Sequence, residues 1–206
     1  MLLKKYVILA HREAGQLKRM IDRHQDGRSH FFIHLDIKTD IAPFKELIQR
    51  DNVTFIASRV DCIWGDFSIV EATINLFRAA VDYGYPDSKI ILLSSQDYPI
   101  KPASHINKYL DENADFDFID FCEFPASNYK QRVLQYKVNF SSNRGDFVFV
   151  RPVFASHIKN FSTFLKLVKH KRIPAGDLHY FLRVRRKKVF KEHFKGSAWC
   201  CLNHST

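Results

Sequence analysis

Four polar side chains in this 206-residue chain each follow a short apolar run, at the point where a buried strand would end. These residues are His11, Asp36, Ser58 and Asp97. The carboxyl ends of parallel strands meet at one edge of a sheet, and ligands of such sheets bind at that edge. The pattern therefore predicts a binding site there, although polar residues also end ordinary strands.

Asp36 is the first candidate for contact with a ligand. A carboxylate at a strand end can accept hydrogen bonds from N–H or hydroxyl groups, and it disfavours any analogue that leaves it unpaired. The alternative is a capping role ahead of the next helix, for which Thr39 and Asp40 are also well placed.

Trp64 is the second candidate, because an indole ring offers a flat apolar wall to a base or a sugar. Gly65 follows it and permits a close approach of the backbone. The alternative is that Trp64 packs in the core, with Asp66 or Ser68 only capping the helix that begins near Phe67.

Asp97 lies between an apolar run and the turn-forming pair Tyr98-Pro99, so its side chain is expected at the rim of the sheet. It could bind sugar hydroxyls or simply cap the turn. The neighbouring Ser94 and Ser95 are not in a G-x-S-x-G pattern, so we do not expect a serine nucleophile.

We predict no metal site. The one Asp-x-Asp triplet, Asp115-Phe116-Asp117, precedes an apolar run instead of following one, and we interpret it as a transition from loop to strand. The cysteines have no zinc-binding spacing and are expected to be reduced and partly buried; they are Cys62, Cys122, Cys200 and Cys201.

Strands and helices are expected to alternate over the first 120 residues, which predicts an α/β fold with a mostly parallel sheet flanked by helices on both faces. The expected strands cover 6–10, 31–35, 53–57, 89–93 and 116–121. The expected helices cover 13–23, a segment from Pro43, 67–81 and 106–110. Beyond residue 120 we expect a strand at 147–150 and a helix over 154–170.

The formal net charge of +10 favours an anionic partner. Nucleic acid, an acidic membrane surface and a sugar-nucleotide diphosphate all carry such charge. The sequence has no named nucleic-acid-binding motif and no basic recognition helix, so we predict no nucleic-acid partner. Its apolar runs are too short for a membrane span.

Four segments occur in a fixed order: HLDIK (34–38), CIWGDFSIVEAT (62–73), LLSSQDYPIKP (92–102) and GSAW (196–199). In this order they resemble the core-2/I-branching N-acetylglucosaminyltransferases and the related peptide O-xylosyltransferases. The resemblance covers the chain from about residue 5 to its end. It implies a GT-A-like (Rossmann-like) fold, a UDP-sugar donor, inversion at the anomeric carbon, and no metal or other cofactor.

The resemblance also implies roles for individual residues. Asp36 would face the uridine, and Asp97 would lie beside the transferred sugar. Ile63 and Trp64 would line the nucleotide or sugar pocket. From its position after the first strand, His11 is also expected among the donor-binding residues. The acceptor sugar would contact Asp120, Glu123, Lys130 and Arg132, for which a solvated surface role is the alternative. The chain departs from the family pattern by Ile37, which separates Asp36 from Lys38.

In the resembling enzymes, the catalytic base is a glutamate some tens of residues beyond the GSAW motif. We therefore expect no catalytic base before Thr206, and we expect residues 1–206 to form a single glycosyltransferase domain without its C-terminal part. The GSAW segment itself is expected to form a tight turn behind the acceptor site.

The predicted function is transfer of N-acetylglucosamine or xylose from a UDP-sugar, in a β-linkage, to a hydroxyl of a glycan or lipid-linked acceptor. The expected setting is a bacterial cytoplasmic enzyme of polysaccharide biosynthesis, with peripheral contact to the inner membrane as an option. The alternatives are an inactive UDP-sugar-binding module and a basic nucleic-acid-binding domain.

Overall fold

The computed structural model describes residues 2–123, 136–139, 147–150 and 194–206. The chain divides into two compact units, one of Met1–Asp120 with Ser197–Thr206 and one of Phe121–Gly196. In the second unit, β6 (Tyr136–Asn139) pairs with β7 (Phe147–Val150) in antiparallel fashion, which confirms the predicted strand at 147–150. The predicted helix over 154–170 lies outside the described residues.

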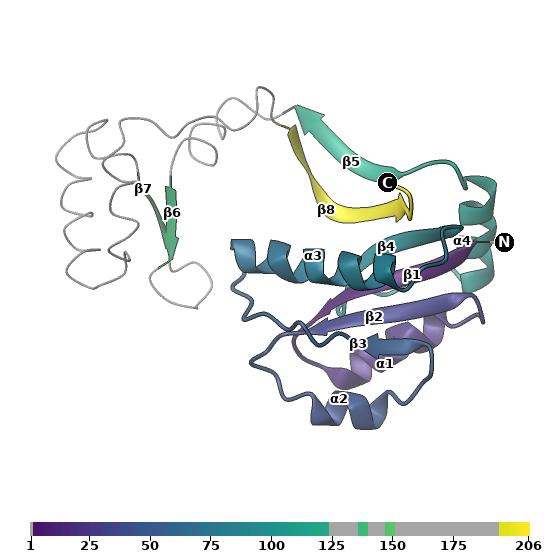
Figure 1. Ribbon diagram of the computed structural model, residues 1–206, viewed down its shortest axis with the longest axis horizontal. Coiled ribbons are helices and arrows are strands. Elements are labelled where there is room, and N and C mark those ends of the chain that lie inside the picture. The colour runs from purple at the N-terminus through teal and green to yellow at the C-terminus, as the bar shows by residue number, and fades with distance from the viewer. Residues whose placement is uncertain (1, 124–135, 140–146, 151–193) are drawn as a thin grey trace. The chain divides into compact units, whose positions relative to one another are not determined.

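A six-stranded sheet with the order β3-β2-β1-β4-β8-β5 forms the centre of the fold (Figure 1). The first four of these strands run parallel, and β8 pairs with β4 in antiparallel fashion. The strands are β1 (Leu3–Ala10), β2 (Ser29–Leu35), β3 (Val53–Phe55), β4 (Ser88–Ser94), β5 (Phe118–Glu123) and β8 (Phe194–Asn203). The predicted α/β fold with a mostly parallel sheet is confirmed.

Helices cover both faces of this sheet because successive strand residues point to opposite sides (Figure 1). On one face, Ile8 and Ile33 pack with Leu17 of α1 (Ala14–His24) and Phe44 of α2 (Ala42–Leu47). On the other face, Leu76 belongs to α3 (Phe67–Asp82), which packs on β1 and β2, and the fourth helix is α4 (Ala103–Glu112). No described helix has the length and hydropathy needed to cross a membrane.

The third strand is shorter than the sequence predicted. It ends at Phe55 and not at Ala57, so Ser58 does not directly follow a strand. The carbonyl of Ser58 instead accepts a hydrogen bond from the side chain of Asn75 at 3.3 Å. Beyond Ser58, the N–H groups of Val60 and Cys62 donate to the side chains of His34 and Asp36.

The prediction of a tight turn at GSAW was wrong, since residues 196–199 lie within β8. The strand is anchored by pairing of Cys201 with Ile91 and of Asn203 with Lys89. Gly196 therefore does not mark a turn here. Glycine also occurs inside strands, where it weakens pairing without ending it.

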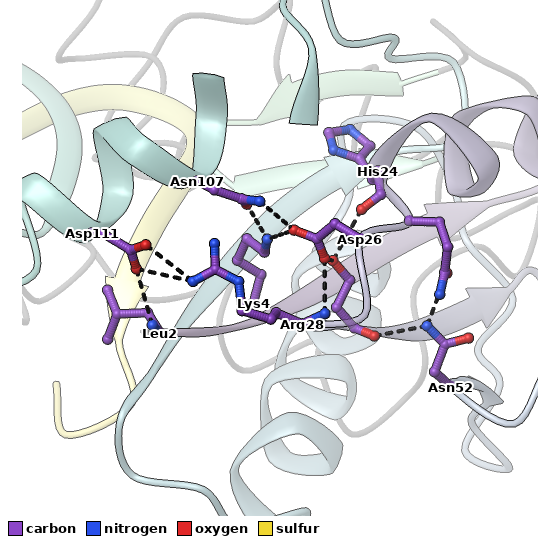
Figure 2. Close-up of polar contacts among 10 residues, drawn as sticks. Leu2, Lys4, His24, Asp26, Arg28, Asn52, Asn107 and Asp111 are labelled. Carbon is purple, nitrogen blue, oxygen red and sulfur yellow. Dashed lines mark hydrogen bonds and ion pairs between the residues drawn. The ribbon is translucent and has the colours of Figure 1, made fainter. Parts of the chain in front are cut away.

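A polar network joins the amino-terminal ends of β1 and β2 to α4, at the opposite end of the strands from the predicted site (Figure 2). Lys4 is only 2% exposed and forms an ion pair with Asp26. Asp26 also accepts hydrogen bonds from Ser29 Oγ and Asn107 Nδ2, both at 2.6 Å. This network fixes the strand ends from which the sheet extends toward the candidate site.

Candidate functional site

The carboxyl ends of β1, β2 and β4 are linked at one edge of the sheet. The N–H of Asp36, after β2, donates to the carbonyl of Ala10 at 2.9 Å, and the N–H of Ser95, after β4, donates to the carbonyl of Leu9 at 2.9 Å. Thr39 Oγ1 donates to the carbonyl of His11 at 2.7 Å. The segments that carry the predicted residues His11, Asp36 and Asp97 therefore meet at the edge where the sequence predicted a site.

The carboxylate of Asp36 is held in place by backbone N–H groups. Its side chain is 8% exposed, and its Oδ1 accepts from the N–H of Lys38 at 2.9 Å while Oδ2 accepts from the N–H of Cys62 at 3.3 Å. The Lys38 ammonium lies 3.5 Å from Oδ2. The capping alternative for Asp36 is not realised, because α2 begins at Ala42 and it is Asp40 that accepts its N–H, at 3.0 Å.

Trp64 lies on the segment that follows, and its side chain is 59% exposed. This exposure excludes the alternative of core packing. Gly65 has a φ of 73°, a left-handed conformation that glycine adopts without strain. Ile63 is partly buried, and its N–H donates to Ser68 Oγ at 2.9 Å, so Ser68 fixes the loop instead of capping α3.

Asp97 closes the turn after β4 and is half-buried. Its Oδ2 accepts from the N–H of Ser94 at 2.8 Å, so the predicted capping role is realised for one oxygen. With Tyr98 and Ile100 it lines a hollow of about 340 Å³ on the sheet face that also carries Ile91. The Ser95 hydroxyl is buried and has no hydrogen-bond partner within the described part of the chain.

The predicted acceptor residues are only partly described. Asp120 is exposed on β5, and Glu123 ends that strand. The side chain of Glu123 and all of Lys130 and Arg132 lie outside the described residues, so their contact with an acceptor stays a prediction.

In the triplet Asp115-Phe116-Asp117, both carboxylate oxygens of Asp117 accept hydrogen bonds from the end of the chain. Asp117 Oδ1 accepts from the N–H of Asn203 at 2.6 Å, and its Oδ2 accepts from Thr206 Oγ1 at 2.7 Å. Since β5 begins at Phe118, the triplet is a loop-to-strand transition, as predicted. In the ranges that the structure covers, no group of three or more His, Cys, Asp or Glu side chains is arranged to hold a metal ion.

All four cysteines are free thiols, and Cys62, Cys200 and Cys201 are partly buried as predicted, whereas Cys122 is exposed. Burial raises the pKa of Cys62 and of Cys201 to about 11, so both stay protonated at neutral pH. Cys62 lies beside Asp36, and its thiol is therefore poorly suited to act as a nucleophile in this site.

The family pattern described as Core-2/I-Branching enzyme matches residues 5–206, nearly the whole chain. The chain belongs to the Core-2/I-Branching enzyme family. The resemblance predicted from the four motifs is thereby confirmed.

The enzymes of the Core-2/I-Branching family are glycosyltransferases. No protein of curated function matches the chain. Among solved structures, Rv0371c from Mycobacterium tuberculosis H37Rv is similar, with 11% sequence identity and a TM-score of 0.38. The similarity covers 57% of this chain and 64% of Rv0371c. This chain therefore spans less than two thirds of the length of Rv0371c.

Two further residues, Arg59 and Arg12, lie at this edge and belong to none of the four motifs. Arg59 donates from Nε to the carbonyl of Leu35 and from Nη2 to the carbonyl of Asp36, both at 2.8 Å. Arg12 is an exposed cation two residues after the end of β1, and the Gln96 amide oxygen, when turned toward it, accepts from Arg12 Nη2 at 3.0 Å. The position of Arg12, directly after His11, could have been recognised in the sequence as a cation near the predicted site. The contacts of Arg59 could not, because they form only when the chain folds.

Proposed function

We propose that this chain binds a UDP-sugar at the carboxyl-terminal edge of its parallel sheet and transfers the sugar to a hydroxyl group of a glycan acceptor. The donor sugar is N-acetylglucosamine or xylose. The observation that carries the proposal is the convergence of three motif segments, those of Asp36, Trp64 and Asp97, at this edge in a member of a glycosyltransferase family.

The chemistry of Asp36 suits recognition of a uridine. A carboxylate has about four acceptor sites, so each oxygen of Asp36 can accept a bond from uracil N–H or a ribose hydroxyl besides the backbone bond it already has. These two backbone bonds hold the carboxylate in a fixed position, so only a ligand with a donor group in the matching place can use its remaining acceptor sites.

The exposed indole of Trp64 provides an apolar face for a base or a sugar ring. Asp97 has one oxygen committed to Ser94, and its other oxygen is suited to accept from sugar hydroxyls. Arg12, exposed after β1, supplies a positive charge suited to the diphosphate. These groups would hold the donor without a divalent metal.

The proposed reaction is a direct displacement. The acceptor hydroxyl oxygen forms a bond to the anomeric carbon from the face opposite the diphosphate, the bond from that carbon to the diphosphate oxygen breaks, and the configuration inverts. A general base takes the hydroxyl proton as the bond forms. The resemblance gives this role to a glutamate beyond the Gly196–Trp199 motif, and we assign it to no residue of 1–206.

Calorimetric titration with UDP, UDP-N-acetylglucosamine and UDP-xylose tests donor binding. The wild-type chain should bind UDP and at least one of the two UDP-sugars, with unchanged affinity in EDTA. Asp36→Ala should weaken binding about tenfold or more, through loss of a charged hydrogen-bond acceptor. Asp40→Ala is the matched control, because Asp40 is an exposed carboxylate in the same loop and should leave affinity unchanged.

Absence of UDP binding by the wild-type chain would overturn the proposal, and loss of binding in EDTA would overturn its metal-free part. Release of UDP in the presence of glycan acceptors then tests transfer. Donor binding with no UDP release from any acceptor would identify the chain as a UDP-sugar-binding module.

A further inference from the structure

After β3 ends at Phe55, the chain continues beside β2 without forming a strand. The N–H of Ile56 donates to the carbonyl of Ile33 at 3.0 Å, and regular pairing stops there. The segment 59–64, which leads to Trp64, nevertheless stays next to the end of β2. The contacts that hold it come largely from the side chains of the HLDIK motif.

Val60 is held through both of its backbone groups. Its N–H donates to Nε2 of His34 at 2.9 Å, and its carbonyl accepts from the N–H of Ile37 at 3.2 Å. Ile37, the residue by which the chain departs from the family pattern, thus contributes its backbone while its side chain is 55% exposed.

Cys62 is held in the same way, two residues further along. Its N–H donates to Asp36 Oδ2 at 3.3 Å, and its carbonyl accepts from Lys38 Nζ at 2.8 Å. Lys38 also contacts the carboxylate of Asp61. Side chains of the motif thus bind three of the four backbone groups of Val60 and Cys62, in place of the backbone partners that a neighbouring strand would have supplied. The fourth group, the Val60 carbonyl, has the Ile37 N–H as its partner.

His34 is the most buried member of this arrangement, with 1% of its surface exposed. An imidazole nitrogen that accepts an N–H must carry no proton, so Nε2 is unprotonated and the neutral ring carries its proton on Nδ1. Burial lowers the pKa of His34 and so favours this neutral form. Of the two charged neighbours, Asp36 acts to raise this pKa and Arg59 acts to lower it.

We propose that His34 is a positioning residue of the donor site, which fixes Val60 through Nε2 and thereby sets the place of the segment that carries Ile63 and Trp64. This inference rests on the proposed function, because it takes this segment to be part of the donor site. His34 does not itself touch the donor. Its removal should weaken donor binding because the segment would no longer be held in its bound position before the ligand arrives.

His30 provides a matched control. It lies four residues before His34 on β2, so its side chain points to the same face of the sheet, and it is 6% exposed. Its Nε2 contacts Thr54 Oγ1 on β3 at 3.0 Å instead of the segment after β3. Loss of either imidazole should lower stability, but only loss of His34 should affect the donor site.

The first test is the affinity for UDP-N-acetylglucosamine of the wild type and three variants. We expect His34→Leu to lose about tenfold or more, since the Val60 N–H loses its acceptor. His34→Gln, whose amide oxygen can reach the same N–H, should stay within about threefold of the wild type, as should His30→Leu. Equal losses in His34→Leu and His30→Leu would overturn the proposal, because they would indicate a general effect on stability.

The second test needs no ligand. Hydrogen exchange at the Val60 amide should become faster in His34→Leu and stay slow in His34→Gln and His30→Leu. Unchanged protection of Val60 in His34→Leu would overturn the positioning contact. If Val60 protection depends on His34 but the wild type binds no UDP-sugar, the contact stands and the proposed function fails.

A third test uses the wild type, in case His34→Leu does not fold. Protonation of His34 removes the acceptor for Val60, so affinity for UDP-N-acetylglucosamine should fall as the pH is lowered through the pKa of His34. The same titration of His34→Gln should lack this decrease. A parallel decrease in both proteins would overturn the assignment of the acceptor to His34.

Discussion

The carboxylate of Asp117 accepts a hydrogen bond from the backbone N–H of Asn203 at 2.6 Å, although 86 positions separate the two residues. Thr206 Oγ1 donates to the other oxygen of the same carboxylate at 2.7 Å. Asn203 in turn pairs with Lys89 of β4. An aspartate in a metal-type triplet therefore has a structural role, which is to hold the end of β8 in its place next to β4.

We expect Asp117→Ala to lower the free energy of unfolding by about 1 kcal/mol, because the two donors lose a charged acceptor but stay accessible to water. Urea denaturation measures this change. Asp115→Ala is the control, because Asp115 is exposed in the same turn and should be neutral. Equal effects of the two substitutions would argue against the role given to Asp117.

The network around Asp26 predicts a loss of stability in acid. Burial by itself would raise the pKa of Asp26, but hydrogen bonds from Lys4, Ser29, Asn107 and the Arg28 N–H outweigh it and lower the pKa to about 2 (Figure 2). A carboxylate with a lowered pKa contributes stability above its ordinary pKa, and this contribution is lost as the pH falls toward the lowered value. The free energy of unfolding should therefore decrease between about pH 4 and pH 2.

Asp26→Asn should lower the free energy of unfolding at neutral pH by about 3 kcal/mol, since it leaves the buried Lys4 ammonium without its negatively charged partner. It should also remove this part of the acid dependence. Denaturation curves at several pH values measure both effects. Asp22→Asn, which disrupts exposed ion pairs, should cost less than about 1 kcal/mol. An Asp26→Asn protein as acid-sensitive as the wild type would contradict the prediction.

His24 predicts a second pH effect, at less acidic values. Burial lowers the pKa of its ring to about 4, and the charge of Lys4 acts in the same direction. The unfolded state binds the proton more readily, so stability should fall as the pH drops below about 6.5 and level off below about 4. His24→Phe keeps a ring next to Tyr6, which lies 4.5 Å away between centroids, and should flatten this part of the curve.

Calorimetry between about pH 4 and pH 6.5 measures the stability of the wild type and of His24→Phe. The Nδ1 atom of His24 is buried without a hydrogen-bond partner in the described residues, so replacing the ring should cost little at neutral pH. An unchanged pH dependence in His24→Phe would mean that another group is responsible.

The two tryptophans provide a fluorescence test of donor binding. The chain has only Trp64 and Trp199, so each single replacement by Phe leaves one reporter. In Trp199→Phe, the emission of Trp64 should change when a UDP-sugar binds, because stacking alters the surroundings of an exposed indole. In Trp64→Phe, the emission of Trp199 should not change and the affinity should fall about tenfold. A response from Trp199 alone would remove Trp64 from the site.

The sequence by itself determined the order of the elements and the edge at which the candidate site lies. Apolar runs such as 31–35 and helical spacing such as 67–81 depend on local periodicity, which one segment can specify alone. The family was also identified from the sequence, because its four motifs are short and ordered. The roles of Asp36, Trp64 and Asp97 toward a donor stay predictions.

Only the tertiary structure decided which partners the polar residues have. Lys4 and Lys5 are charged, so a position outside the core would be expected, yet both are buried in β1. Their burial is possible because Lys4 pairs with Asp26 and Lys5 donates to the carbonyls of Gly84 and Tyr85. Gly196 likewise lies within β8, a strand that the sheet places between β4 and β5. The contact of His34 with Val60 joins residues 26 positions apart. Such contacts follow from the packing of distant segments, and no local pattern of residues encodes them.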